Sequence, residues 1–222
     1  MKKLILASAC LLTFTDGVRA SSTVSERIAA ATEILLARQT SPKPIPQKII
    51  NDARGIAIVS VGRGGFIFGG SRGEGVVITR TRGALGPSWS APIAFTLSGG
   101  SFGAQIGYEK INFVFILNSE SAIIEFLSNS GVKWNAGTQG AAGPDYAVEH
   151  ADDEQPAVYV YTQSDGVYGG ATVGDSTLRL DHDANRRAYG ADFSALNLAN
   201  GHGQRPAAAA KLYELLNGPA EE

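Results

Sequence analysis

The chain has 222 residues, of which 44% are hydrophobic and 18% are charged, and its formal net charge is −2. This length and composition are typical of one globular domain with a sizeable core. The 27 glycines show no collagen-like period and fall in strand-like stretches, which excludes a collagen or a low-complexity disordered chain. The net negative charge argues against a nucleic-acid-binding protein.

The first 20 residues are predicted to be a signal peptide that is not part of the fold. Two lysines precede an apolar stretch at residues 4–14, and Val18-Arg19-Ala20 is a small-x-Ala cleavage site. We therefore expect export, to the periplasm or the outer membrane, with residues 21–222 as a single domain. The alternative is a lipoprotein anchored at Cys10. Cleavage after Ala20 removes this cysteine, the only one in the chain, so no disulfide is expected.

Two helices are predicted before the first strand. Thr23 and Glu26 form a capping box for an amphipathic helix that ends near Gln39. Alternating prolines then make a stiff connector, and the last of them opens a short helix through Ala53. Gly55 is expected to end that helix in a left-handed C-cap.

The stretch from Arg54 to Gly83 is predicted to organise the fold. Its β-branched runs indicate three strands separated by glycine corners, because glycine within strand patterns marks bulges and bends. A second stretch, from Ala157 to Leu180, has the same character, and its Gly166-Val-Tyr-Gly-Gly run matches Gly65-Phe-Ile-Phe-Gly-Gly in the first. We therefore expect two similar meanders in one strongly bent antiparallel β-sheet or barrel.

The other predicted elements lie between and after these stretches. Further strands are predicted at Trp89–Leu97, Phe102–Glu109 and Ile111–Leu117. Asn118 is expected to cap a helix that Gly131 closes, and Asp181 or Asp183 to cap one that ends at Gly190. A last helix opens at Pro206. Strands without regular βα alternation, with helices at the N-terminus, in the middle and at the C-terminus, predict the α+β class.

A set of ordered landmarks makes the chain resemble the SYLF domain family from about Ser25 to Gly190. The landmarks are Ile45-Pro46, Ala53-Arg-Gly-Ile-Ala-Ile58, Gly65-Phe-Ile-Phe-Gly-Gly70, Trp89-Ser-Ala-Pro92, Phe113-Val-Phe-Ile-Leu-Asn118, Gly166-Val-Tyr-Gly-Gly170 and Asn185-Arg-Arg-Ala-Tyr-Gly190. The resemblance implies a non-enzymatic domain that binds anionic lipids through a basic N-terminal helix and the adjoining surface, and fungal members also bind actin. For an exported member it implies phospholipids or other envelope amphiphiles as ligands.

The basic residues of the N-terminal segment and of the glycine corners are the predicted lipid-binding site. They are Arg27, Arg38, Lys43, Lys48, Arg54, Arg63 and Arg72. Basic amphipathic helices typically lie on membrane surfaces, whereas ordinary solvated charge is the simpler interpretation of the same residues. Under that interpretation the domain is a protein-interaction or scaffolding module. Backbone nests at the glycine corners could hold one lipid phosphate beside Arg63 or Arg72, and the alternative role of these glycines is sheet curvature.

Catalytic and metal sites are weakly indicated. Ser71 and Ser101 each lie in a G-x-S-x-G pattern, but strand patterns follow both, whereas a nucleophile elbow needs a strand–turn–helix context. A serine hydrolase is therefore the weakest of the alternatives. His150 and His182 stand beside aspartates that suit solvated loops or a helix cap, so neither a metal nor a cofactor is predicted. The large aromatic residues are expected in the core and not in a lipid slot; they are Phe66, Phe68, Trp89 and Trp134.

Overall fold

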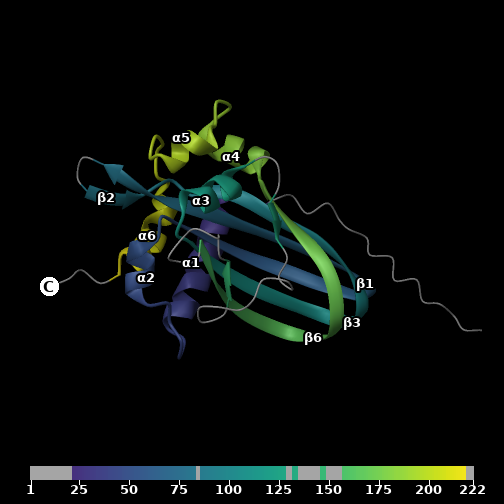
Figure 1. Ribbon diagram of the computed structural model, residues 1–222. Helices are drawn as coiled ribbons and strands as arrows, with labels where there is room; N and C mark the ends of the chain where they lie inside the picture. Colours follow the sequence, from purple (N-terminus) through teal and green to yellow (C-terminus); the bar gives the residue numbers. More distant parts are fainter. Residues whose placement is uncertain (1–21, 84–85, 129–131, 135–145, 149–156, 219–222) are drawn as a thin grey trace, which may run out of the picture.

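The computed structural model describes residues 22–83, 86–128, 132–134, 146–148 and 157–218. It has an α+β fold with one antiparallel sheet, whose strands lie in the order β2-β1-β3-β6-β4, with β5 also paired to β6 (Figure 1). The predicted class is confirmed: the sheet is strongly bent, and helices precede, interrupt and follow it. The sheet is open and does not close into a barrel. The predicted signal peptide lies outside the described residues.

The elements follow one another in this order along the chain. The helices are α1 (Val24–Gln39), α2 (Gln47–Asp52), α3 (Glu120–Leu127), α4 (His182–Tyr189), α5 (Ala195–Ala199), the 3₁₀ helix η1 (Ala207–Ala209) and α6 (Ala210–Asn217). The strands are β1 (Gly55–Gly83), β2 (Gly86–Trp89), β3 (Ile93–Leu117), β4 (Val132–Trp134), β5 (Tyr146–Val148) and β6 (Val158–Leu180).

Three long strands make up most of the sheet. β1 pairs with β3 from Gly55 opposite Leu117 to Val77 opposite Ile93, and β3 pairs with β6 along the whole length of β6. The expectation of several short strands in each glycine-rich stretch is therefore wrong, because each stretch is one continuous strand. The glycines let each strand bend back without a tight turn: Gly62, Gly64, Gly70, Gly73 and Gly75 of β1 do not take a positive φ, whereas Gly107 of β3 has a φ of 129°.

The two matching glycine runs lie at the same bend of the sheet. Gly65 of β1 stands opposite Gly107 of β3, and Gly107 stands opposite Tyr168 of β6. At this bend the three strands curve together, away from the helices, at the end where Figure 1 labels β1, β3 and β6. The likeness between the two runs therefore reflects one curvature that neighbouring strands share.

The two halves of β1 approach each other closely. A Cβ atom at Gly75 would lie 2.3 Å from the carbonyl oxygen of Ile58, and one at Gly73 would lie 2.8 Å from that of Ser60. At the open end, the backbone N–H of Arg80 donates to the carbonyl of Arg54 at 2.7 Å. Distances below 3 Å leave no room for a side chain, so glycine is required where β1 folds back on itself.

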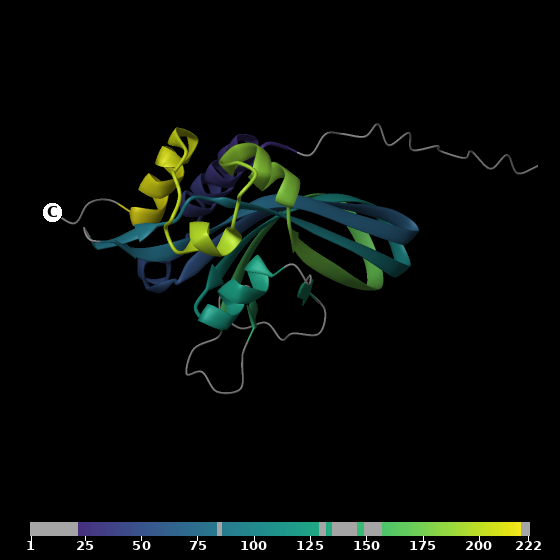
Figure 2. The same cartoon turned by 90° about the horizontal axis from the view of Figure 1, so that it is seen from above.

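Two hydrophobic clusters lie on opposite faces of the sheet. One joins α1, α2 and α6 to residues such as Ile56, Val76 and Trp89. The other joins α3 and α5 to residues such as Val59 and Phe95. Figure 2 shows α1 and α6 on one side of the strands and α3 on the other. Trp89 is in the core as predicted, whereas the side chains of the other three aromatic residues assigned to it lie outside the described residues.

The predicted helix caps are partly confirmed. Thr23 and Glu26 form the capping box of α1, and Asp181 accepts from the N–H of Ala184 at the start of α4. Gly190 ends α4 with a φ of 99°. Ser119, and not Asn118, caps α3: the Ser119 hydroxyl accepts from the N–H of Ala122, whereas the backbone N–H of Asn118 donates to the carbonyl of Ala157.

Three predicted boundaries are wrong. The α2 helix ends at Asp52, its C-cap Ala53 has extended backbone, and Gly55 begins β1 without the left-handed conformation that was expected. The strand predicted at 89–97 is interrupted between Trp89 and Ile93, where Ser90 donates its N–H to Thr79 and Pro92 has no N–H to give. The α3 helix ends at Leu127 with Ser128 as its C-cap, so it does not extend to Gly131, which was expected to close it. The short α5 helix was not predicted.

The fold-back of β1 gives a direct test. Gly75→Ala places a methyl group against the Ile58 carbonyl, and we expect a loss of stability of about 3 kcal/mol, at the upper end of overpacking costs. Gly100→Ala is the matched control, because a Cβ there has no neighbour within 4 Å. Urea unfolding followed by circular dichroism measures both variants. Equal midpoints for Gly75→Ala and Gly100→Ala would show that the close approach is not needed.

Candidate functional site

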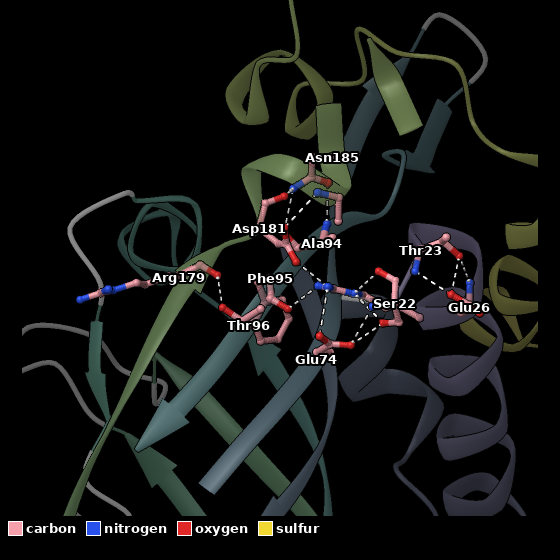
Figure 3. A network of polar contacts seen from close by, with 12 residues as sticks. Ser22, Thr23, Glu26, Glu74, Ala94, Phe95, Thr96, Arg179, Asp181 and Asn185 are labelled. Atoms are coloured by element: carbon pink, nitrogen blue, oxygen red, sulfur yellow. Dashed lines mark hydrogen bonds and ion pairs between the residues drawn. The ribbon is translucent and has the colours of Figure 1, made fainter. Parts of the chain in front are cut away.

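Arg27 was predicted to contact lipid head groups, but it is buried, with 2% of its surface exposed. Its Nη2 pairs with Asp181 at 2.5 Å and with Glu74 at 3.6 Å, and its Nη1 donates to the carbonyl of Phe95 at 2.9 Å. Its Nε donates to Ser22. Figure 3 shows these partners converging from the start of α1, from β1 and β3, and from the start of α4. The guanidinium therefore holds four segments together.

Asp181 and Asn185 extend this network into the sheet. The side-chain oxygen of Asn185 accepts from the N–H of Ala94 at 2.8 Å, and its amide nitrogen donates to the Ala94 carbonyl at 2.8 Å (Figure 3). Asn185 is fully buried. Its two bonds satisfy the backbone of Ala94 on the side where β6 has ended and no longer pairs with β3. The network fixes the position of α4 relative to β3.

The second arginine of α1 also points inward. Arg38 is 9% exposed, and its guanidinium lies 5.0 Å from the centre of the Tyr161 ring, a cation–π distance. The face that α1 shows to solvent instead carries Glu26, Glu33 and the 44%-exposed Leu36. The helix therefore presents carboxylates outward and cations inward, which is the reverse of a basic membrane-facing helix.

The other predicted cations fall in two separate places. Lys43, Lys48 and Arg54 are exposed on the connector, on α2 and just before β1. Arg63 lies on the curved part of the sheet and is paired with Glu109 at 2.6 Å, whereas Arg72 is exposed there. The seven residues thus do not form one site. The glycines near Arg63 and Arg72 lie within the paired part of β1 and β3.

A basic surface does gather at one end of the molecule. We call it the basic end and define it by Lys48, Arg54, Arg80, Arg82 and Arg205. Arg80 connects its parts: it donates to the carbonyls of Ile50 and Ala53 at the end of α2, and it stacks 4.1 Å from the centre of the Trp89 ring in β2. In Figure 1, α2, α6 and β2 lie together at this end.

Electrostatics at the basic end are set by burial and by one carboxylate. Desolvation lowers the pKa of Arg80, and the nearby Asp52 carboxylate raises it. Asp52 itself pairs with Lys48 at 2.6 Å, in an exposed contact. Arg205 donates to the Ser88 hydroxyl of β2 at 2.7 Å, and Arg54 and Arg82 are exposed just before β1 and near its end. This end of the molecule therefore carries an excess of positive charge.

Sequence reasoning found only part of this surface. Lys48 and Arg54 were predicted, but Arg80, Arg82 and Arg205 were not. The Arg80-x-Arg82 spacing was the available signal, because residues two apart in a strand share a face. Arg205 carried no such signal, since it reaches β2 from a distant loop.

The alternative catalytic motifs do not have the context that their chemistry needs. Ser71 lies within β1 and Ser101 within β3, so neither stands at a strand–turn–helix elbow. Asp181, beside His182, is engaged by Arg27 and by the cap of α4. Among the described residues, no group of three or more His, Cys, Asp or Glu could hold a metal ion. His150 lies outside these residues.

The described part of the chain also contains no helix that is long and apolar enough to cross a membrane.

The buried Arg27 network gives a second test. Arg27→Met removes the cation and leaves the largely buried Asp181 carboxylate uncompensated, so we expect a loss of stability of about 3 kcal/mol. Lys48→Met is the control, because the exposed Lys48–Asp52 pair contributes at most about 0.5 kcal/mol. Denaturant unfolding measures both. If Arg27→Met proved as stable as Lys48→Met, the structural role of Arg27 would be contradicted.

Sequence comparison shows which known proteins the chain resembles. A family model described as "Ysc84: Las17-binding protein actin regulator" matches residues 98–218. Protein YSC84 of Saccharomyces cerevisiae is 32% identical over 181 residues, which are 79% of this chain and 38% of that protein. LAS seventeen-binding protein 3 of the same species is 30% identical over 181 residues, 79% of this chain and 39% of that protein.

An animal relative is equally similar. The human SH3 domain-containing YSC84-like protein 1 is 32% identical over 191 residues, which are 85% of this chain and 55% of that protein. The chain thus spans between about two fifths and about half of the length of these relatives. No solved structure matches it. Together, the family model and the relatives confirm the resemblance seen in the sequence, and the chain belongs to the Ysc84, or SYLF domain, family.

Proposed function

We propose that the chain is a non-catalytic protein-binding domain and that the basic end is the surface that contacts its partner. The partner is a protein with an acidic surface. The observation that carries this proposal is the position of Arg80 against the end of α2 and of Arg205 on β2, with the exposed cations Lys48, Arg54 and Arg82 on the neighbouring segments, in a protein whose net charge is −2.

The way these cations are held supports a contact surface. Arg80 is fixed by two carbonyls and by the Trp89 ring, and Arg205 is fixed by Ser88. Side chains that are already ordered lose less conformational entropy when a partner binds. Arg54 and Arg82 remain exposed beside them. The surface therefore combines fixed and accessible cations, an arrangement that suits recognition of carboxylates.

The names of the relatives support the same class of function. The family model is described as a Las17-binding protein and actin regulator, and one yeast relative is named for binding LAS seventeen. These descriptions concern protein partners. The animal relatives are named for an SH3 domain, which is a further protein-binding module. Export, expected from residues 1–20, would place the natural partner of this chain outside the cytoplasm, so Las17 and actin filaments serve in the test below as stand-ins taken from the description of the family.

Lipid binding by a basic N-terminal helix, the main expectation from the sequence, has less support in this structure. The two arginines of α1 are buried, and its exposed face is acidic. Anionic lipids would have to reach Lys43, Lys48 and Arg54 without help from the helix. Each cation near an anionic membrane contributes about 1 kcal/mol, so three would give weak and salt-sensitive binding.

A charge reversal tests the proposal. In the double variant Arg54→Glu, Arg82→Glu we expect binding to purified Las17 or to actin filaments to weaken by at least about tenfold, because like charges then face an acidic partner. Surface plasmon resonance for Las17 and co-sedimentation for actin measure this. Binding by the wild type should also weaken as ionic strength rises.

The matched control reverses two exposed cations elsewhere, Lys110→Glu and Arg179→Glu, and we expect it to bind like the wild type. Anionic phosphatidylserine vesicles form the third arm of the experiment. If the chain binds neither Las17 nor actin and is retained by these vesicles, the proposal is wrong and lipid binding takes its place. Equal loss in the two double variants would show that net charge, and not the basic end, determines binding.

A further inference from the structure

Asparagine is followed by glycine at two places in the chain, Asn200-Gly201 and Asn217-Gly218. In such a pair the backbone nitrogen of the glycine can attack the side-chain amide carbon of the asparagine, because glycine puts no side chain in the way. Ammonia leaves, and a five-membered succinimide ring forms. Both asparagines are exposed and stand at the end of a helix, so sequence and exposure alone do not distinguish them.

The backbone that follows Asn200 is held by the fold. The N–H of Gly201 donates to the carbonyl of Leu198 in α5 at 2.9 Å. A Cβ atom at Gly201 would lie 3.2 Å from Cγ2 of Thr81, so this backbone packs directly on β1. To attack Asn200, the Gly201 nitrogen must give up its hydrogen bond and move relative to β1. The fold therefore opposes the reaction at Asn200.

The backbone that follows Asn217 is held less firmly. Asn217 is the last residue of α6, and Gly218 leaves the helix with a φ of 71°. Within the described part of the chain, the N–H of Gly218 has no acceptor. The attacking nitrogen therefore has no hydrogen bond to give up before it reaches the side chain of Asn217.

The side-chain amide of Asn217 is polarised by a fixed donor. The indole N–H of Trp89 donates to Oδ1 of Asn217 at 3.1 Å. Trp89 is 2% exposed, so the core sets the position of this donor. An N–H aimed at a carbonyl oxygen stabilises the negative charge that the oxygen gains when a nucleophile attacks its carbon. A free nitrogen and a polarised carbonyl thus lie next to each other at Asn217.

From these contacts we propose that Asn217 is a site of spontaneous deamidation, and that the folded chain directs the reaction there in preference to Asn200. The bond that forms joins the Gly218 nitrogen to Cγ of Asn217, and the bond that breaks releases the side-chain nitrogen as ammonia. The proton of the Gly218 N–H is lost to solvent base. Water then opens the ring: cleavage at Cγ gives aspartate and cleavage at the backbone carbonyl gives isoaspartate, and either cleavage restores an N–H on the nitrogen.

The product places a negative charge next to the basic end. The new carboxylate stands at the N–H edge of the Trp89 ring, and the guanidinium of Arg80 lies 4.1 Å from the centre of the same ring. Figure 1 shows α6 beside α2 and β2 at this end of the molecule. Deamidation therefore lowers the positive charge of the basic end. This consequence for binding rests on the proposed function, whereas the reaction itself does not.

Peptide mapping by mass spectrometry tests the proposal on the full chain, incubated in mildly alkaline buffer with and without urea. In the folded chain we expect Asn217 to react at least about tenfold faster than Asn200, and in urea we expect the two rates to agree within about threefold, because the contacts that separate them are lost. Equal rates in the folded chain, faster reaction at Asn200, or no reaction at Asn217 would overturn the proposal.

A variant of the donor tests the role of the Trp89 N–H. Gly218 is left unchanged, because a Cβ there would lie 2.7 Å from Cδ of Gln47. Trp89→Phe keeps an aromatic ring and removes the N–H, and circular dichroism checks that it folds. We expect the rate at Asn217 to fall by at least about threefold and the rate at Asn200 to stay the same. An unchanged rate at Asn217 in the folded variant would contradict the role of this donor.

The effect on binding is measured separately with Asn217→Asp, and Asn200→Asp is the matched control. We expect Asn217→Asp to weaken binding to Las17 or actin filaments by about threefold and Asn200→Asp to leave it unchanged. If Asn217 deamidates as expected but the two variants bind equally, the modification site is confirmed and its link to the basic end is wrong. Failure of the wild type to bind either protein contradicts the proposed function and leaves the deamidation result as it is.

Discussion

The close approach of the two halves of β1 is the constraint on which the rest of the structure depends. Gly73 and Gly75 bring the strand within contact distance of its own first half, and the Arg54–Arg80 backbone bond joins the halves at the open end. Because β3 pairs with β1 and β6 pairs in turn with β3, both strands must follow the same bend. Both hydrophobic clusters, and the helices that cover them, are placed by this one fold-back.

The same constraint decides where charge can appear on the surface. The N-terminal helix covers one face of the bent sheet, and both of its arginines fall on the covered side. There Arg27 links α1, β1, β3 and α4 through hydrogen bonds and ion pairs, because a guanidinium can donate in several directions at once. The open end of β1, by contrast, projects Arg80 and Arg82 beside α2 and β2, where a loop from the C-terminal part adds Arg205. The exposed positive charge therefore lies at the basic end and not on the N-terminal helix.

The domain is best understood as a rigid platform. Its helices are tied to the sheet by bonds from buried side chains to backbone, such as Asn185 to Ala94 and Thr79 to Ala199. Such bonds fix the relative positions of elements and leave little for binding to reorganise. A platform with one positively charged end suits the protein-binding role that we propose, and the family is described as an actin regulator.

The sequence by itself determined the elements that depend on neighbouring residues. The capping box at Thr23 and Glu26, the Asp181 cap, the glycine end of α4, the α+β class and the family could all be predicted, because they rest on short-range hydrogen bonding and local patterns. Only the tertiary structure decided whether the glycine runs would bend or break the strands, and which side of α1 would be buried. Helical spacing places Arg27 and Arg38 on one face but does not say that Asp181, 154 residues further on, lies there. The basic end could not be predicted for the same reason: its members are brought together by the folding-back of a strand, a long-range contact that no local pattern encodes.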